Sequence, residues 1–275
     1  MKVLHVHNVA NVPGTICKAL AAEGVEARFE ESASEDGVRW CDVVHSHYAV
    51  NRKTLAALKM ARRFGKPAVL HHHGSDVRII TATGMRPLPP WWGYVSNRAR
   101  RQAAKVVLAT PDLVDFYPAG IYVPNPVDTD MFKPLGGEKS DRVLICGRQV
   151  KGSRLPKFID AARQYDCINT GPAIKLPANV RILEPVPRAQ FAAFLNRYSE
   201  MIGAIGDLVT MARMEAMACG LKTFSDFDEK YVRYYDGENP DKAADPRDFV
   251  LRHHSMKLVA GRTIAIYEEV LAKGR

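Results

Sequence analysis

The 275-residue sequence has no apolar run of the ~18–20 residues that are needed to span a bilayer. Its N-terminus, MKVLHVHNVANVPG, opens directly on an alternating strand pattern and lacks the features of a signal peptide. The five cysteines are scattered and include no Cys-x-x-Cys pair, which is typical of reduced core thiols. We therefore expect a cytoplasmic protein without disulfides.

The sequence also lacks G-x-G-x-x-G and the spacing of a nucleotide-hydrolase phosphate loop. Instead, the turn Gly147-Arg148-Gln149-Val150-Lys151-Gly152 follows a predicted strand. Glycine lets the backbone approach a phosphate closely, and the two cations Arg148 and Lys151 can neutralise a diphosphate. A strand-end turn whose cations face water is the alternative interpretation.

Acidic residues are nearly absent from residues 51–105, which contain twelve Lys and Arg side chains and Asp76 as the single carboxylate. Such a patch attracts phosphates. Within it, Trp91 and Trp92 precede Arg98 and Arg101, an arrangement that suits an anionic membrane surface. Single-stranded nucleic acid and a hydrophobic loop anchor are the alternatives, and because charge alone supports nucleic acid, we do not expect it as a partner.

Strand patterns alternate with helix patterns along the chain, which predicts α/β architecture with parallel sheets wound on both faces. The pattern stops in the proline-rich segment 121–134 and restarts after Leu135–Ser140. We therefore expect a first domain over 1–134, a second over 135–255 and a closing helix over 256–275. Further strands and helices are predicted at Cys41–His45, Pro67–His71, Leu155–Arg163, Asn179–Leu183, Arg188–Arg197 and Leu221–Ser225, with Thr83–Tyr94 irregular.

Seven of the nine histidines lie in the predicted first domain, at or near strand ends. Clustered histidines can ligate zinc. However, successive side chains of a strand point to opposite faces, so His71, His72 and His73 cannot all converge. We therefore predict no metal site, and we expect His47 and His73 to act as hydrogen-bonding groups at a cleft. Histidines with purely structural hydrogen bonds are the alternative.

Glu215 lies in a predicted helix, Met211–Ala218, that is apolar nearly all round and is followed by Gly220. A carboxylate in such a helix must be paired, protonated or reserved for a ligand. Two neighbouring ribose hydroxyls can both donate to one carboxylate. The alternative is a structural ion pair with a nearby cation.

Five segments, taken in order, resemble the retaining glycosyltransferases of the GT-B fold, the "glycosyl transferases group 1" family. They are CDVVHSHYA, FGKPAVLHHHGSDV, VPNPVDTDMFKP, ICGRQVKG and EAMACG. The resemblance implies two Rossmann-type parallel-sheet domains that face a central cleft. It also implies that a sugar is transferred from a nucleotide-diphosphate sugar to a glycan or lipid-linked acceptor, with retention of anomeric configuration.

The resemblance also implies residue roles. Arg148 and Lys151 would hold the donor diphosphate in place of a metal, so that no metal and no cofactor is expected. Glu215 would accept from the ribose, and Asp207 stands where the family usually has a second glutamate. His73 would lie beside the sugar. The remaining implied contacts are Gly14, Gly147, Leu183, Val186 and Met211 on the donor side, and His47, Asp76, Trp91, Trp92, Arg98 and Arg101 on the acceptor or membrane side.

Two other functions fit the same segments. One is a GT-B-fold epimerase or phosphorylase acting on a sugar phosphate. The other is an inactive subunit that only binds a nucleotide sugar or another transferase. This alternative is based on Asp207, whose side chain is shorter than the glutamate usual in the family.

Overall fold

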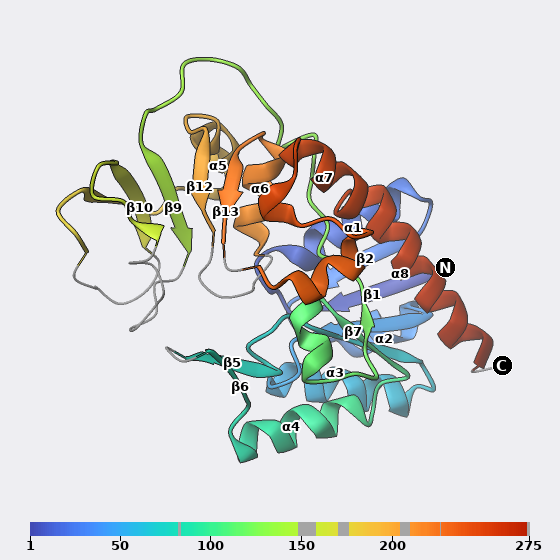
Figure 1. Cartoon of the computed structure of the whole chain (residues 1–275). Coiled ribbons are helices and arrows are strands. Elements are labelled where there is room, and N and C mark those ends of the chain that lie inside the picture. The colour runs from blue at the N-terminus through green and yellow to red at the C-terminus, as the bar shows by residue number, and fades with distance from the viewer. Residues whose placement is uncertain (82–83, 148–157, 170–175, 204–209, 226, 274–275) are drawn as a thin grey trace. The chain divides into compact units, whose positions relative to one another are not determined.

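The structure is a computed structural model that describes residues 1–81, 84–147, 158–169, 176–203, 210–225 and 227–273 (Figure 1). The chain forms two compact units. The first comprises Met1–Ile79, Met85–Pro126 and Met256–Arg275, and the second comprises Ile80–Gly84 and Val127–Ser255. Each unit contains one parallel β-sheet, so the predicted α/β class with two Rossmann-type units is confirmed.

The first unit is built on a sheet with strand order β2-β1-β3-β4-β7-β8, in which every neighbouring pair is parallel. Its strands are β1 Lys2–Val6, β2 Glu26–Glu30, β3 Val43–His47, β4 Ala68–His72, β7 Lys105–Leu108 and β8 Ile121–Tyr122. A separate two-stranded sheet pairs β5 Arg78–Thr81 with β6 Gly84–Pro87.

The helices of the first unit begin at recognisable caps. The Ser34 hydroxyl accepts from the Gly37 N–H, the Asn51 side chain accepts from the Lys53 N–H, and Pro90 occupies a first-turn position of its helix. These helices are α1 Val12–Ala22, α2 Glu35–Trp40, α3 Arg52–Arg63, α4 Pro90–Arg100 and α8 Met256–Lys273, with a 3-10 helix at Pro111–Asp115.

The two faces of the first sheet differ in chemistry because side chains alternate along each strand. Leu4 and Val44 lie on the face that packs against α2, α3 and α4 and forms an apolar core. His5 and His45 are register partners on the opposite face, where both contact Tyr267 of α8. This face carries the histidines discussed below.

The second unit contains a sheet with strand order β11-β10-β9-β12-β13, again with all neighbouring pairs parallel. Its strands are β9 Val143–Gly147, β10 Tyr165–Asn169, β11 Val180–Leu183, β12 Glu200–Ile202 and β13 Lys222–Phe224. Its helices are α5 Arg188–Leu195, α6 Met211–Ala218 and α7 Pro246–His253, with 3-10 helices at Glu229–Tyr235 and Pro240–Lys242.

Several sequence predictions were wrong. The segment Thr83–Tyr94, predicted as irregular, contains β6 and the start of α4, because Pro90 opens a helix there. Strand β10 and helices α2 and α7 were not predicted. Of the helix predicted at Leu155–Arg163, residues 155–157 lie outside the described residues and 158–163 form no α-helix.

The units divide the chain differently from the predicted domains. Apart from the short segment Ile80–Gly84, which belongs to the second unit, the first unit runs to Pro126 rather than to Pro134. It resumes at Met256, so α8 belongs to the first unit, where it packs against α1. The Val127 N–H donates to the His254 carbonyl at 2.8 Å. The first and last residues of the segment Val127–Ser255 therefore lie side by side within the second unit.

Asp166 in β10 links several elements of the second unit, although it is 1% exposed. Its carboxylate accepts from the Arg142 guanidinium at 2.6 Å, from Arg181 at 2.9 and 2.8 Å, and from the Tyr198 hydroxyl at 2.8 Å. Burial raises the pKa of Asp166, but these donors lower it by more, so the pKa lies below its ordinary value. This polar centre explains why the strand was missed from its sequence.

We expect Asp166→Ala to destabilise the second unit by roughly 1–3 kcal/mol, because it leaves the buried Tyr198 hydroxyl and the partly exposed guanidinium groups of Arg142 and Arg181 without their shared acceptor. Denaturant unfolding gives the free energy of unfolding directly. The matched control is Asp141→Ala at an exposed position, which we expect to change it by less than about 0.5 kcal/mol. Equal effects of the two substitutions would contradict the linking role of Asp166.

Candidate functional site

Each sheet has one point where the strand order reverses, and ligands of parallel α/β sheets bind outside the carboxyl ends of the strands at such points. In the first unit this point lies between β1 and β3, and in the second between β9 and β12. The carboxyl ends next to these points carry His5, His47, Gly147 and Gly203.

Five histidine rings and one tyrosine form a continuous hydrogen-bonded row in the first unit. In sequence along the row, His73 Nε2 lies 2.9 Å from His47 Nδ1, and His47 Nε2 lies 3.0 Å from His5 Nδ1. The Tyr267 hydroxyl lies 3.3 Å from His5 Nε2 and 2.5 Å from His45 Nδ1. His45 Nε2 then lies 3.3 Å from His71 Nδ1.

The rings of this row, which we call the histidine cluster (His5, His45, His47, His71 and His73), are neutral. Burial lowers the pKa of His5 to about 3 and that of His73 to about 4, and it places the pKa values of the other three well below their ordinary range. Neutral imidazoles each offer one N–H and one lone pair. The cluster is therefore rich in nitrogen lone pairs.

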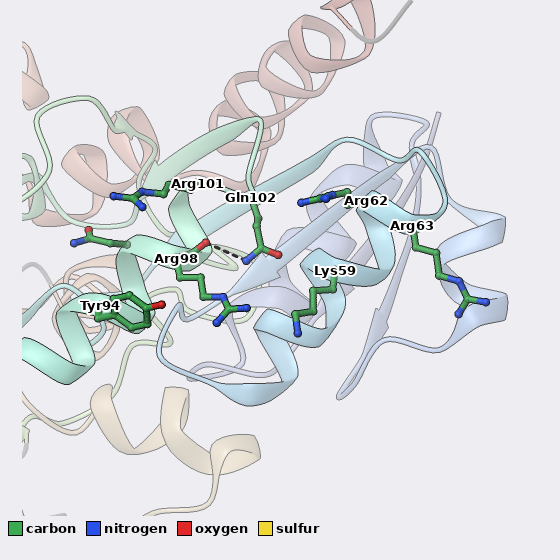
Figure 2. A pocket seen from close by; sticks show the side chains of 8 residues that line it. Lys59, Arg62, Arg63, Tyr94, Arg98, Arg101 and Gln102 are labelled. Atoms are coloured by element: carbon green, nitrogen blue, oxygen red, sulfur yellow. Dashed lines mark hydrogen bonds between the residues drawn. The ribbon is translucent and has the colours of Figure 1, made fainter.

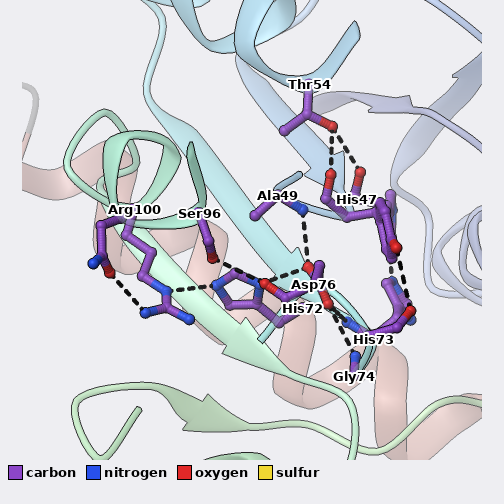
Figure 3. Close-up of polar contacts among 12 residues, drawn as sticks. His47, Ala49, Thr54, His72, His73, Gly74, Asp76, Ser96 and Arg100 are labelled. Carbon is purple, nitrogen blue, oxygen red and sulfur yellow. Dashed lines mark hydrogen bonds and ion pairs between the residues drawn. The ribbon is translucent and has the colours of Figure 1, made fainter. Parts of the chain in front are cut away.

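His72 points to the opposite side of β4 and belongs to a different network (Figure 3). Its Nδ1 lies 2.6 Å from Asp76 Oδ2, and Arg100 Nε donates to its Nε2 at 3.0 Å. Because Arg100 occupies Nε2, the His72 proton lies on Nδ1 and is donated to Asp76.

Asp76 is fully buried, and its carboxylate accepts three further N–H groups, from Ala49 at 2.8 Å and from His73 and Gly74 at 3.0 Å. Burial raises the pKa of Asp76, but His72 and these N–H groups lower it by more, so the carboxyl stays ionised. Asp76 therefore fixes the backbone that carries His73; it is a positioning residue and is not exposed to an acceptor.

Backbone strain gathers at the same edge of the first sheet. His7, Ala10, Asn11 and Tyr48 have φ of 70°, 50°, 60° and 67°, which non-glycine residues rarely adopt. Gly14, in the first turns of α1, is exposed, and a Cβ there would lie 3.2 Å from Asn11 Oδ1. The loop before α1 thus holds a costly conformation beside the histidine cluster.

Apart from Gly14, which lies in α1 of the first unit, the predicted donor residues belong to the second unit. Gly147 ends β9 at the reversal point, whereas Arg148, Lys151 and Asp207 lie outside the described residues. Met211 is the first residue of α6 and is half-buried. Leu183, at the end of β11, and Val186 are also half-buried.

Glu215 is 2% exposed, and its Oε1 lies 2.6 Å from Arg188 Nη1 of α5. Burial raises the pKa of Glu215 to about 7 even though Arg188 lowers it. The structural ion pair considered from the sequence is therefore present. It does not fully compensate the buried charge, so a ligand with hydroxyl donors remains compatible with this position.

A cationic surface covers α3 and α4, with a hollow of 680 Å³ between them (Figure 2). Its lining residues are Lys59, Arg62, Arg63, Tyr94, Asn97, Arg98, Arg101 and Gln102. Trp91 and Trp92, on the first turn of α4, are 70% and 49% exposed, which excludes the hydrophobic-anchor interpretation. None of the helices in the described ranges has both the length and the apolar character that crossing a bilayer requires.

Some of these groups were not identified from the sequence. Tyr267 and Arg188 were missed because nothing local marks them as partners of histidines or of Glu215. The cations of α3 were counted in the basic region, but their place beside α4 was not predicted. By contrast, strand alternation alone predicts that His45 and His47, two residues apart on one strand, lie on the same face.

No family model and no curated protein matches this sequence. The fold is similar to that of AviGT4, a glycosyltransferase involved in avilamycin A biosynthesis, with TM-score 0.66 and 15% identity over 99% of this chain and 98% of that one. It is also similar to sucrose-phosphate synthase from Thermosynechococcus elongatus, with TM-score 0.67 and 11% identity over 99% and 100%.

A third similar structure is a putative UDP-N-acetylglucosamine 2-epimerase from Listeria monocytogenes, with TM-score 0.56 and 11% identity over 99% of this chain and 97% of that one. At these identities the likeness establishes the fold. The chemistry must be argued from the residues.

The raised pKa of Glu215 predicts a specific pH dependence. Between its ordinary value of 4.5 and about 7, the folded chain holds a proton that the unfolded chain has released, so stability falls as pH rises. Replacing Glu215 by Gln removes this dependence. We expect the free energy of unfolding of the variant, relative to that of the wild type, to increase by roughly 3 kcal/mol from pH 4 to pH 8.

Chemical denaturation of both proteins over this pH range measures the difference. The neighbouring thiols do not interfere, because burial raises the pKa of Cys146 to about 12 and that of Cys219 to about 11. A difference that is constant with pH would show that folding does not raise the pKa of Glu215.

Proposed function

We propose that this protein transfers a sugar from a nucleotide-diphosphate sugar to an acceptor hydroxyl, with retention of anomeric configuration. The observation that carries the proposal is the reversal point of the second sheet. There β9 ends at Gly147, directly before Arg148 in the sequence, and α6, which holds the buried carboxylate of Glu215, packs against the same strand. The fold likeness to glycosyltransferases and the order of the five sequence segments support it.

In this proposal the donor's nucleotide is held by the second unit. Arg148 and Lys151 neutralise the diphosphate and stabilise the charge that grows on it as it departs, so the transfer itself proceeds without a divalent metal. Glu215 accepts from the ribose hydroxyls, in exchange for part of its contact with Arg188. Asp207 contacts the transferred sugar, and the backbone at Leu183–Val186 lies beside the base.

The reaction exchanges one bond at the anomeric carbon for another on the same face. The bond to the diphosphate oxygen breaks as the acceptor oxygen bonds to that carbon, and the acceptor's proton passes to the departing phosphate oxygen. His73, neutral and held by Asp76, supplies a hydrogen bond to the sugar from the first unit. Gly14, in the strained first loop, allows a close approach to the backbone.

The cationic surface of the first unit supports an acceptor that is held at a membrane. Lysine and arginine side chains attract anionic headgroups, while Trp91 and Trp92 are exposed beside them as interfacial anchors. We therefore propose that the protein works at the cytoplasmic membrane face on a lipid-linked or membrane-proximal acceptor.

Nucleotide binding tests the donor site. A thermal-shift screen of nucleoside diphosphates identifies the preferred base, because a ligand of the folded state raises the melting temperature. We then expect Arg148→Ala and Lys151→Ala to raise the calorimetric Kd for that nucleotide by roughly 10–100-fold, since a hydrogen bond to a charged group contributes about 1.5–3 kcal/mol.

Arg197→Ala is the matched control, because it removes the same charge from an exposed position of the second unit. Its Kd should equal that of the wild type. Unchanged binding in both turn variants would remove the diphosphate site. Release of free sugar or a glycosylated product by the purified chain alone separates a working transferase from a binding subunit.

Vesicle flotation tests the membrane surface. We expect binding to vesicles that contain phosphatidylglycerol but not to pure phosphatidylcholine, and Arg98→Glu with Arg101→Glu should weaken it by at least about tenfold, because each cation contributes roughly 1 kcal/mol. Lys257→Glu with Arg262→Glu, two exposed cations of α8, is the control of equal charge change. If both double variants lose vesicle binding to the same extent, the binding depends on the net charge of the protein and not on this surface.

A further inference from the structure

Several ring nitrogens of the histidine cluster lie close together, and one of them, His71 Nε2, has no hydrogen-bond partner among the described residues. Two groups of three rings each offer three nitrogens, one per ring, that all lie within 4.8 Å of one another. The first group is His5, His45 and His47, and the second is His47, His71 and His73. The second group reaches the less buried end of the cluster, because His73 is half-buried whereas His47 and His71 are fully buried.

We propose that His47, His71 and His73 bind a divalent transition-metal ion of the zinc type. The donor set consists of imidazoles without a carboxylate or thiolate, which suits zinc, copper, nickel and cobalt and disfavours magnesium and calcium. Three protein ligands leave a fourth position of a tetrahedral ion to water or to another oxygen ligand. The inference goes beyond the proposed sugar transfer and does not depend on it.

Hydrogen bonds leave one group of the row unsatisfied. Each ring and the Tyr267 hydroxyl carries one proton, so the row is satisfied in either direction of donation up to His71 Nδ1. His71 Nε2 is buried and has no hydrogen-bond partner among the residues the structure describes. Buried polar atoms are rarely left so. A metal ion supplies the missing partner.

The other nitrogens of two ligands are already held, as those of metal-binding histidines usually are. His47 Nε2 lies 3.0 Å from His5 Nδ1, and His71 Nδ1 lies 3.3 Å from His45 Nε2. His5 and His45 are in turn both bonded to the Tyr267 hydroxyl. These contacts orient the rings. For the ion to bind lone pairs of both His47 Nδ1 and His71 Nε2, His5 Nε2–H and His45 Nδ1–H both donate to the Tyr267 oxygen.

Strand alternation, which argued against three consecutive histidine ligands, permits this set. His71 and His73 lie two residues apart and therefore share a face, and His47 is the register partner of His71 on the neighbouring strand. His72 faces the other side and is engaged by Asp76 and Arg100. We predicted no metal site from the sequence because the consecutive residues His71, His72 and His73 cannot share a face. The set His47, His71 and His73 does not have this restriction.

The test uses the full-length chain with any affinity tag removed, stripped with a chelator and then given Zn²⁺ or Co²⁺ alone. We expect one ion per chain by elemental analysis after gel filtration, and a Co²⁺ visible spectrum of the intense, tetrahedral kind. His71→Leu should abolish uptake, and His5→Val, which removes a supporting ring, should weaken zinc binding by roughly 10–100-fold.

His7→Gln is the matched control, because His7 follows the same strand but contacts Asn51 and Glu31 outside the cluster. It should bind as the wild type does. Failure of the wild-type chain to retain zinc, or loss of binding in His7→Gln with retention in His71→Leu, would overturn the proposal. If His71→Leu does not fold, the wild-type Co²⁺ spectrum decides, since an octahedral spectrum or none contradicts three imidazole ligands.

Discussion

Parallel strand pairing is the constraint on which both units depend. It aligns the carboxyl ends of all strands at one edge of each sheet, so residues that are far apart in sequence meet at the point where the strand order reverses. In the first unit this edge collects the histidine cluster and the strained first loop. In the second it collects the end of β9, and α6 packs beside that strand.

Both units place charged or polar groups inside, and both satisfy them through partners from other elements. Asp76 accepts from four donors, Asp166 from three side chains, and the fully buried Arg213 donates to Thr223, Ser225 and Asp241. These networks hold strands and loops in fixed relation. Glu215 is the contrast, because Arg188, its one side-chain partner in the described part of the chain, leaves its pKa raised to about 7. A buried group that is incompletely compensated is a reasonable place for a ligand.

Local signals predicted much of the fold. The helix Met211–Ala218 was predicted with the bounds that the structure has, since strong helix formers stand between the Thr210 cap and Gly220. Strand β10 was missed because Asp166 interrupts its apolar pattern, and its charge is compensated by residues that precede or follow it by many positions. The start of α4 was missed because proline was taken as a loop signal although it also favours a helix's first turn.

The sequence by itself determined the alternation of strands and helices, the two parallel sheets and the side of each strand on which a residue lies, because these follow from local periodicity. It therefore placed His45 with His47, and His71 with His73. The tertiary structure alone decided which groups those rings meet. Tyr267 lies 262 residues from His5, and only the packing of α8 on the first sheet brings the hydroxyl between His5 and His45. Side-chain partnership depends on strand order and helix packing, which no local pattern encodes.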